Sequence, residues 1–571
     1  MSTVSNSQFR FFAVAAICLA SVLCYVNTFS GEFVWDDVSS VLMHKHVQDP
    51  SKLLQLFKED QHAFGRGQGN FYRPLVSVSF MVDYLFSKPP SVDAANGPQG
   101  PALAPFAFHM SNMIWHALAA LMFFALAARM GAPRFVQLAA PLLYVSHPLH
   151  TEAVAYISGR ADPMSAAFMF AALCFAFRKG STRRQLIGSA LCCLCFVLAV
   201  ISKESALILP AVLFLAIILF REKGELPEAT DRSRPLPSLV GILVILAGYA
   251  ALRATVLNFG SDTAPRDISV GQRILEVGQA FALYLKLIFV PTGLHMERVL
   301  DGSPGWLAGV GYVLLVVCLV AFAGAWLRGQ RRIAFGIGLF LVCWFPVSGI
   351  IPLNAPMAEH WMYVPLAGFI WALVEVFWLA LGSRVPALAY TLTYAAFAVL
   401  VALTVQRNLD WRSNEALYLS TLKYNPDSAR IQFNLAVTYQ DLLDNPFGAR
   451  RHYEEVLALY AKKKAGMQFD AKTEPFWDEE LESHLSLGQL FMNDQRFDKA
   501  APHFAMLLRV NPDERNRWML ATASLGLGQC MLAAGRPDDA RKYIEQAGAI
   551  DPACKPEADR MLQAIAARGS A

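Results

Sequence analysis

The sequence predicts an all-α protein in two parts, a polytopic helical bundle in a membrane followed by a smaller soluble domain of helical repeats. Its residues are 55% hydrophobic and only 16% charged, whereas a soluble domain carries about 25% charged residues. Long apolar runs recur as far as residue 405, and from about residue 411 the composition turns polar and helical. We therefore expect a membrane domain over 1–410 and an extracytoplasmic tetratricopeptide-like repeat domain over 411–571.

Apolar runs that are long enough to cross a bilayer predict about 11 spans. One weaker run, 273–290, carries four polar residues, Arg273, Glu276, Gln279 and Lys286. This polarity indicates an amphipathic helix that lies in the membrane interface without crossing. The expected spans are 11–29, 106–128, 135–155, 161–177, 185–201, 205–220, 237–256, 305–327, 332–350, 363–381 and 385–405. The first run is longer than the apolar core of a signal peptide, so we read it as an uncleaved span.

The short loops set the orientation of the spans. Loops 178–184, 221–234 and 328–332 are rich in Lys and Arg, which favours the cytoplasmic side. Eleven crossings then place the long loop 30–104 and the C-terminal tail outside. We expect a multi-pass protein of a bacterial inner membrane with its site in the periplasm, or of the endoplasmic reticulum membrane in a eukaryote. The net charge of +4 is small for 571 residues, so no nucleic-acid partner is implied.

The C-terminal tail contains an internal repeat. Residues 485–504 align with 525–544, and each segment contains the sequence Leu-Gly-Gln. The two segments are about 40 residues apart, whereas the tetratricopeptide repeat has a period of about 34 residues. We therefore expect an insertion near 513–518. Residues 429–459 form a third candidate unit. Such repeats build a concave surface that binds proteins, and generic helical hairpins are the alternative.

Two adjacent carboxylates, Asp36 and Asp37, follow the first span. Neighbouring side chains in an extended segment point to opposite sides, so the two do not form a dyad that shares a proton. One carboxylate is a candidate for catalysis. The alternative is that Asp37 caps the helix that follows. Trp35 beside them is either an interface anchor or a platform on which a sugar stacks.

Several other ionisable residues lie at the external membrane edge, where charge is costly and marks functional candidates. Arg73 is placed to hold a phosphate bidentately, or simply snorkels to the interface. Lys203 is placed to neutralise a lipid phosphate, and Glu204 to cap the next helix. Glu359 and His360 occupy the last external loop.

Histidines gather near the second and third spans. His109, Asn112 and His116 share one helical face by their spacing, which fits a site or a hydrogen-bonded contact between helices. The densest cluster, over 146–165, holds His147, His150, Glu152, Arg160 and Asp162. Its spacing is not that of a known zinc motif, so a divalent metal is left open.

The motifs FVWDD, YRPL, FH..N...H, HP.H.E.V..I.GRAD, SKE and EHWMYVPL occur in this order. With the repeat tail, they resemble the transmembrane-and-tetratricopeptide-repeat family of O-mannosyltransferases, within the C-type glycosyltransferase superfamily. The resemblance implies a glycosyltransferase that uses a polyprenyl-phosphate sugar, with Asp36 and Asp37 beside the acceptor. It also implies that Arg160 and Asp162 line the same cavity. The short tail departs from relatives that often have many repeats.

We therefore expect transfer of mannose or another hexose from a polyprenyl phosphate to Ser or Thr hydroxyls of exported proteins, with inversion. Asp36 is favoured as the base because Asp37 is better placed as a cap. Arg73, Lys203 or Arg253 would hold the donor phosphate. Nothing in the sequence selects the sugar.

Two alternative functions stay open at this point. In the first, the enzyme transfers the sugar to a lipid or to a glycan of an envelope polymer. In the second, the protein is a non-enzymatic scaffold that carries repeats on a membrane anchor. A transporter is disfavoured because 1–405 show no related halves.

Overall fold

The computed structural model describes most of the chain. The described residues are 5–65, 70–87, 103–221, 235–259, 268–300, 302–382, 384–467 and 474–569. Within these ranges the secondary structure is helical and includes no strand. The predicted all-α class is therefore confirmed.

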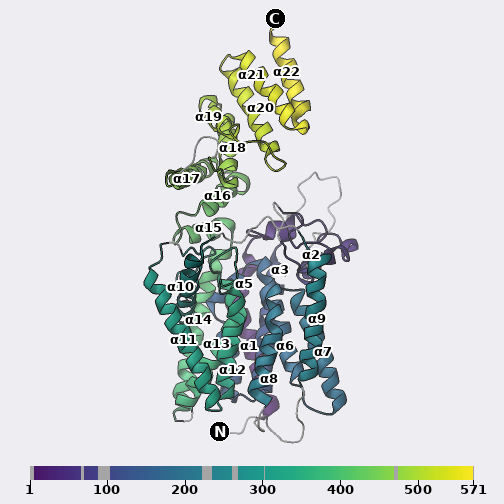
Figure 1. The fold of residues 1–571 in the computed structure, drawn as a ribbon, viewed down its shortest axis with the longest axis vertical. Coiled ribbons are helices and arrows are strands. Elements are labelled where there is room, and N and C mark those ends of the chain that lie inside the picture. Colours follow the sequence, from purple (N-terminus) through teal and green to yellow (C-terminus); the bar gives the residue numbers. More distant parts are fainter. Residues whose placement is uncertain are drawn as a thin grey trace. The chain divides into compact units, whose positions relative to one another are not determined.

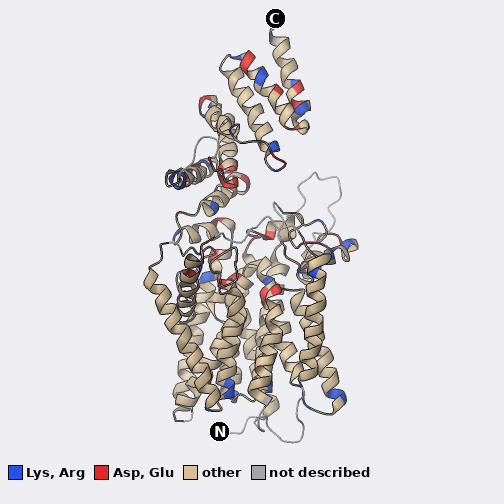
Figure 2. Ribbon diagram, in the orientation of Figure 1, with Lys and Arg blue, Asp and Glu red and all other residues tan. Residues whose placement is uncertain are grey.

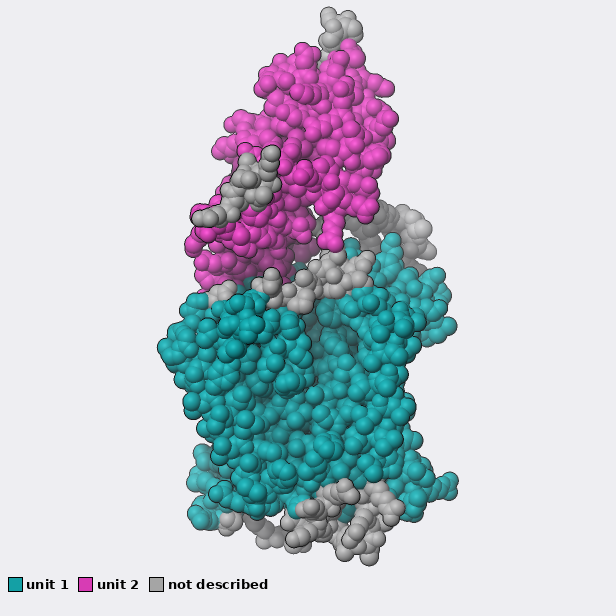
Figure 3. All heavy atoms as spheres, in the orientation of Figure 1, with its two compact units in different colours: residues 1–417 teal, residues 418–571 magenta. Residues whose placement is uncertain are grey.

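The chain divides into two compact units, residues 1–417 and 418–571 (Figure 3). Figure 1 shows the helices of each unit. The helices of the first unit are α1 (Asn6–Tyr25), α2 (Pro74–Ser87), α3 (Phe106–Arg129), α4 (Arg134–Val145), α5 (Thr151–Val154), α6 (Ala161–Ala176), α7 (Thr182–Val200), α8 (Leu209–Arg221), α9 (Leu236–Thr255), α10 (Val270–Phe289), α11 (Gly305–Leu327), α12 (Arg331–Trp344), α13 (Tyr363–Phe377) and α14 (Pro386–Asn408). Helix α15 (Asn414–Leu422) spans the division, and the second unit continues with α16 (Ala429–Val437), α17 (Pro446–Ala465), α18 (Asp478–Asn493), α19 (Phe497–Leu507), α20 (Arg517–Ala533), α21 (Pro537–Ile550) and α22 (Lys555–Gly569).

The first unit is a membrane bundle. Seven helical segments of the described chain are long and apolar enough to cross a bilayer, namely Asn6–Ser30, Phe106–Arg129, Thr182–Val200, Leu236–Thr255, Gly305–Leu327, Glu359–Gly382 and Pro386–Trp411. The other four predicted spans correspond to the shorter helices α4, α6, α8 and α12. The protein is thus a multi-pass membrane protein, with helices at all eleven predicted positions.

The predicted span 135–155 is broken in the structure. Helix α4 ends at Val145, and the chain continues through a short 3₁₀ turn, Pro148–His150, into α5. The cause is Pro148, because the residue before a proline is pushed out of the helical region. His147 accordingly has an extended backbone, with φ −80° and ψ 127°. This break places several polar side chains of the sequence motif on a folded loop.

Helix α10 packs closely on α11 near one end of the bundle. A Cβ atom added to Gly311 would lie 1.8 Å from the carbonyl oxygen of Gly278, so the two backbones touch there. The Gln279 amide also donates to the Ser303 carbonyl, just before α11 starts. The middle of α10 is therefore level with the first turns of α11.

The second unit consists of helical hairpins that pack through small residues. Phe504 of α19 lies between Gly488 of α18 and Gly526 of α20, where added Cβ atoms would approach its ring to 2.5 and 2.7 Å. The glycines of the aligned repeat segments are thus required by packing. Ala500 and Ala540, at equivalent positions of the two segments, are both fully buried.

Charged residues of the bundle are unevenly placed. Figure 2 shows most acidic residues of the first unit at the end near α2 and α3, with the middle of the long helices almost free of charge. The segment after α14 reaches the same end, because Asn408 donates to the Cys24 carbonyl at the end of α1. The loop after α1 and the start of the tail therefore lie on one side of the membrane.

Candidate functional site

The loop Gly31–Asp37 is fixed by the residues that follow α14. The backbone N–H of Glu32 donates to the Arg412 carbonyl at 2.9 Å, and that of Trp35 donates to Asn414 Oδ1 at 2.9 Å. Trp35 has a left-handed backbone, with φ 50°, which is uncommon for a bulky residue and marks a constrained position. The loop is therefore held in one conformation by residues that are distant in sequence.

Asp37 is fully buried and joins this loop to a second one. Its Oδ1 accepts from the backbone N–H and the hydroxyl of Ser158, at 2.8 and 2.6 Å. Its Oδ2 accepts from the Val34 N–H at 3.0 Å. Its side chain makes no hydrogen bond that caps the short helix Val38–Leu42. Burial raises the pKa of Asp37 to about 7, although these hydrogen bonds oppose the shift.

Asp36 is half-buried beside Asp37. Burial first, and then the neighbouring charges of Asp36 and Asp37, raise the pKa of Tyr156 well above its ordinary value. The Tyr156 ring stacks between Trp35 and Trp411, with ring centroids 5.6 and 5.3 Å away. Asp36 thus lies next to an aromatic stack that connects three separate segments of the chain.

His62 is a neighbour of Asp36 that the sequence reasoning missed. Its Nδ1 lies 3.0 Å from the Ser39 hydroxyl and 3.1 Å from the Ser40 hydroxyl. Burial lowers the pKa of His62, and the charges of Asp36 and Asp60 oppose that shift. The loop around His62 shows no periodicity, so no signal in the sequence brought it to Asp36. We call Trp35, Asp36 and His62 the outer face.

Arg160 anchors a buried network below this face. Its guanidinium forms an ion pair with Asp83 at 2.5 Å and donates to Asn112 Oδ1 at 2.6 Å. The Asn112 amide in turn donates to three carbonyls of the loop before Arg160, those of Val154, Tyr156 and Ile157. We call Asp37, Asp83, Asn112, Ser158 and Arg160 the inner network. Its members are all buried, and they shape the loop to which Asp37 binds.

The predicted phosphate-binding cations are occupied by carboxylates. Arg73 binds both Glu204 oxygens, at 3.0 and 2.6 Å, and Lys203 binds both Asp162 oxygens at 2.7 Å. Arg253 differs, because its guanidinium donates only to oxygens of Leu257 and Asn70 in the described part of the chain. Glu204 therefore forms an ion pair with Arg73, from which it is separated by 131 residues of sequence.

The histidines of the second and third spans are packed into the bundle. His116 lies 2.5 Å from the Tyr363 hydroxyl and 3.0 Å from the Val145 carbonyl. His147 contacts the Ile288 carbonyl at 2.9 Å. His109 and His150 are buried, and their ring nitrogens have no geometric hydrogen-bond partner among the described residues. Those residues also contain no group of three or more His, Cys, Asp or Glu that is suited to a metal.

Glu152 and the last external loop form a further polar contact. Glu152 binds the ring and the backbone N–H of His360, at 2.8 and 3.0 Å. Glu359 binds Arg298 at 3.1 Å and Arg407 at 3.4 Å. Neither arginine was singled out in the sequence, since their partners are 61 and 48 residues away. These pairs tie α14 and the loop before α11 to the start of α13.

The site residues thus separate into buried groups that hold loops and a half-buried carboxylate beside a histidine. Buried polar groups that are fully bonded fix geometry. A partly exposed carboxylate on a rigid loop can accept a proton from an incoming hydroxyl. The arrangement therefore suits general-base chemistry at the membrane surface.

Comparisons with known proteins identify similarity to repeat proteins and to O-mannosyl-transferases. The tetratricopeptide repeat family model matches residues 491–565, so the C-terminal unit contains such repeats. The chain is 22% identical over 555 residues to protein O-mannosyl-transferase TMTC3 of Mus musculus, covering 89% of this chain and 55% of that protein. It is 24% identical over 438 residues to protein O-mannosyl-transferase F38B6.6 of Caenorhabditis elegans, covering 74% and 59%.

The chain spans 55% and 59% of the length of these two relatives. Among solved structures, it is similar to the apo crystal structure of the Archaeoglobus fulgidus oligosaccharyltransferase, with a TM-score of 0.36, 14% identity, and coverage of 83% of this chain and 62% of that one. The resemblance drawn from the ordered motifs is confirmed by the similarity to O-mannosyl-transferases over most of this chain.

Proposed function

We propose that this protein is a membrane glycosyltransferase that moves a hexose, such as mannose, from a polyprenyl phosphate to Ser or Thr hydroxyls of exported proteins. The observation that carries the proposal is the half-buried carboxylate of Asp36, on a loop held by Asp37. The similarity to protein O-mannosyl-transferases supports the same reaction class.

In this proposal Asp36 is the general base. It takes the proton of the acceptor hydroxyl while the hydroxyl oxygen attacks the anomeric carbon. The bond between that carbon and the phosphate oxygen breaks, and the polyprenyl phosphate leaves. A single displacement of this kind inverts the anomeric configuration. His62 lies beside the same carboxylate and supports its orientation.

The donor phosphate requires a cation at the external edge. Arg253 supports this role because its guanidinium donates to neutral oxygens only, within the described residues. Arg73 and Lys203 are secondary candidates for binding the phosphate, since each already neutralises a carboxylate. Charge stabilisation of a leaving phosphate by fixed cations is a large contributor to such reactions.

The acceptor is proposed to be a protein because of the repeats in the second unit. Concave repeat surfaces bind extended segments of other proteins. The chain leaves the bundle at the end that carries Asp36, because Trp35 is bonded to Asn414. We propose that this is the non-cytoplasmic side, the periplasm in a bacterium. Transfer to a lipid or glycan acceptor is the second candidate, since Asp36 would accept the proton of such a hydroxyl in the same way.

The test is transfer of labelled mannose from a polyprenyl phosphate to a Ser/Thr-rich exported protein by the full chain in a bilayer. Asp36→Asn should lower turnover by about 10²–10⁴-fold, the usual contribution of general-base catalysis. Glu32→Gln is the matched control, since Glu32 is an exposed carboxylate of the same loop. Normal transfer by Asp36→Asn would disprove the assignment of Asp36 as the general base. Label found only in lipid or glycan would select the second candidate.

A further inference from the structure

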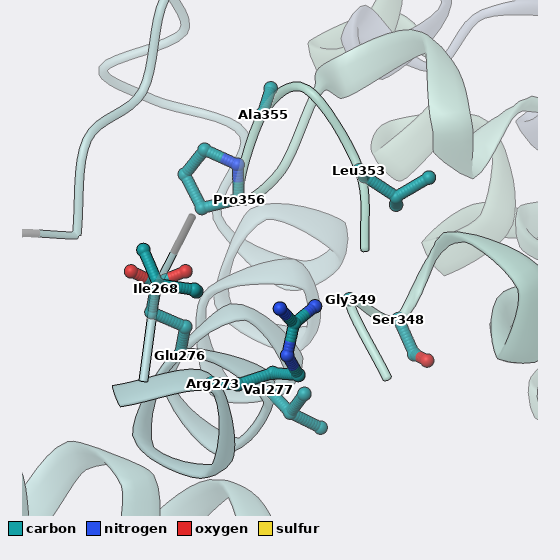
Figure 4. A pocket seen from close by; sticks show the side chains of 9 residues that line it. All are labelled: Ile268, Arg273, Glu276, Val277, Ser348, Gly349, Leu353, Ala355 and Pro356. Carbon is teal, nitrogen blue, oxygen red and sulfur yellow. The ribbon is translucent and has the colours of Figure 1, made fainter. Parts of the chain in front are cut away.

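The pocket in Figure 4 lies between the start of α10 and the loop after α12, and its lining includes Arg273 and Glu276. The space in it that a water molecule can occupy is about 10 Å³, which holds about one water. The pocket is therefore too small for a lipid headgroup or a sugar. A larger ligand is indicated by charges at the end of the bundle that is remote from Asp36.

The turn between α6 and α7 is strongly basic. It has the sequence Arg-Lys-Gly-Ser-Thr-Arg-Arg over 178–184, and Figure 2 shows basic residues at this end of the bundle. Arg129 at the end of α3 lies within electrostatic range of Cys174, one turn before this sequence. No Asp or Glu occurs in 94–151 or in 163–203, so neither hairpin supplies a carboxylate. We call Arg129, Arg178, Arg183 and Arg184 the basic cluster.

The arginines of the basic cluster differ from other arginines at the same end of the bundle. Their guanidinium groups have no hydrogen-bond or ion-pair partner in the part of the chain that the structure describes. By contrast, Arg332 pairs with Glu375 at 2.6 Å, and Arg331 donates to the Leu219 carbonyl at 2.6 Å. The described residues therefore leave the positive charge of the basic cluster without a neutralising group.

Two glycines bring the stems of Arg178 and Arg184 together. A Cβ atom on Gly180 would lie 2.8 Å from Cδ of Arg184, and one on Gly188 would lie 3.1 Å from Cβ of Arg178. Gly188 follows Arg184 by one turn of α7, so both stems pack against the start of this helix. Neighbouring guanidinium groups repel each other, and the positive end of the helix dipole adds to the repulsion. An anion bound at this turn would offset both costs.

The length of α6 brings the turn to the level of the lipid headgroups. Helix α6 has 16 residues and is therefore about 24 Å long, whereas the hydrocarbon core of a bilayer is about 30 Å thick. Its start follows the loop in which Ser158 binds Asp37, at the end of the bundle that carries Asp36. A short apolar helix draws its ends toward the bilayer, so the turn after α6 lies within reach of lipid phosphates.

An apolar stripe on α7 continues from Arg183 along the bilayer. Leu186, Ile187 and Leu194 are 59%, 44% and 52% exposed. Their spacing places them with Arg183 on one face of the helix. A ligand whose phosphate binds the arginines can therefore lay an acyl chain on this stripe. This combination fits an anionic phospholipid, because a soluble phosphate would leave the stripe uncovered.

We propose that the basic cluster binds an anionic phospholipid of the adjacent leaflet, with the phosphate held by Arg178, Arg183 and Arg184. Guanidinium groups bind phosphate oxygens bidentately, and clusters of Lys and Arg beside a membrane helix bind anionic lipids. A zwitterionic lipid carries a cationic group that the same arginines repel. The proposal is independent of the sugar transfer proposed above, because the cluster lies at the other end of the bundle from Asp36.

The experiment is native mass spectrometry of the full chain, released from bilayers that contain equal amounts of phosphatidylglycerol and phosphatidylcholine with the same acyl chains. Phosphatidylglycerol should be retained preferentially, and less so at high salt, because exposed charges are screened. Arg183→Gln and Arg184→Gln together should weaken its retention about 25-fold, at about fivefold for each charge lost.

The matched control combines Arg328→Gln and Arg384→Gln, which removes two exposed arginines from other turns at the same end of the bundle. This control should retain the wild-type amount of phosphatidylglycerol. The melting temperatures of both double variants should match the wild type, because the replaced side chains have no bonding partner among the described residues. A lower value in the Arg183 and Arg184 variant would assign these arginines to folding instead.

Four further results would overturn the proposal. Equal retention of both lipids by the wild type would show that the basic cluster does not select an anionic lipid. Unchanged retention in the Arg183 and Arg184 variant would exclude these side chains from binding. An equal loss in the control would show an effect of net charge alone. Displacement of the lipid by soluble glycerophosphoglycerol, which has the same phosphodiester and no acyl chain, would show a site for free anions.

Discussion

In the inner network, the charged groups are buried and bonded from several directions. Asp37 accepts three hydrogen bonds, and the Arg160 guanidinium binds Asp83, Asn112, Ser79 and the Phe108 carbonyl. On the outer face, Asp36 and His62 are half-buried. The two regions share one loop, in which Asp36 belongs to the outer face and the neighbouring Asp37 to the inner network. The difference teaches that burial with full bonding identifies structural charge, whereas partial exposure on a rigid support leaves a carboxylate available for chemistry.

The largest expected effect on stability is at Arg160. Arg160→Met leaves the buried Asp83 carboxylate without its partner, and breaking a buried pair costs about 3–5 kcal/mol. The thermal melting of the detergent-solubilised protein should fall sharply, whereas Arg412→Met, an exposed arginine of the same side, should not change it. A variant at Arg160 that melts like the wild type would mean that the inner network is not needed for folding.

His44 should make the loop before His62 sensitive to acid. Burial, and then the charge of His46, lowers the pKa of His44 to about 4 in the folded protein, against 6.5 in the unfolded chain. The folded state therefore disfavours the proton, and stability is complete above pH 6.5 and is lost as the pH falls toward 4. The loss is on the order of 3 kcal/mol.

Limited proteolysis of residues 38–65 between about pH 4.5 and 7 measures this effect. Cleavage of the wild type should increase in acid, and His44→Gln should flatten the dependence, since Gln carries no titrating proton. An equal pH dependence in both proteins would assign the acid sensitivity to another group.

Asp37→Asn should cost less than the loss of Arg160. An amide nitrogen in place of Oδ2 cannot accept from the Val34 N–H, so this buried donor is left unsatisfied, at about 1–3 kcal/mol. Differential scanning calorimetry should record this loss. Asp36→Asn in the same assay should melt as the wild type does. Equal melting of the two variants would erase the distinction between the inner network and the outer face.

Trp35→Leu should have the smallest effect on stability. It removes the stack on Tyr156, and an aromatic pair contributes about 0.5–1.5 kcal/mol beyond its buried area. Urea-induced unfolding monitored by the remaining tryptophans checks this value. A loss above about 3 kcal/mol would place Trp35 among the residues that hold the fold together.

The sequence was sufficient for the architecture. Helical apolar runs, basic loops and the Leu-Gly-Gln repeat follow from local periodicity and composition, so the bundle, the repeats and the polar helix α10 could all be predicted. The predicted span 135–155 was too long, because the chain breaks before Pro148 and α4 ends at Val145.

The partners of the charged residues could not be predicted in this way. Arg73 was expected to hold a phosphate, yet Glu204 occupies it across 131 residues of sequence. His62, Arg298 and Arg407 escaped notice because each becomes meaningful only through a contact that the fold creates. A single sequence lists the ionisable groups at one membrane edge, but the contacts between distant segments decide which of them remain accessible.

The most direct test of the distinction between the outer face and the inner network compares Asp36→Asn with Asp37→Asn. The initial rate of mannose transfer per folded molecule and the melting temperature are measured for both variants. We predict that Asp36→Asn lowers the rate by about 10²–10⁴-fold at an unchanged melting temperature, whereas Asp37→Asn lowers the melting temperature and reduces the rate far less. A normal rate in Asp36→Asn, with a lost rate in Asp37→Asn at unchanged melting, would contradict the assignment of the two carboxylates.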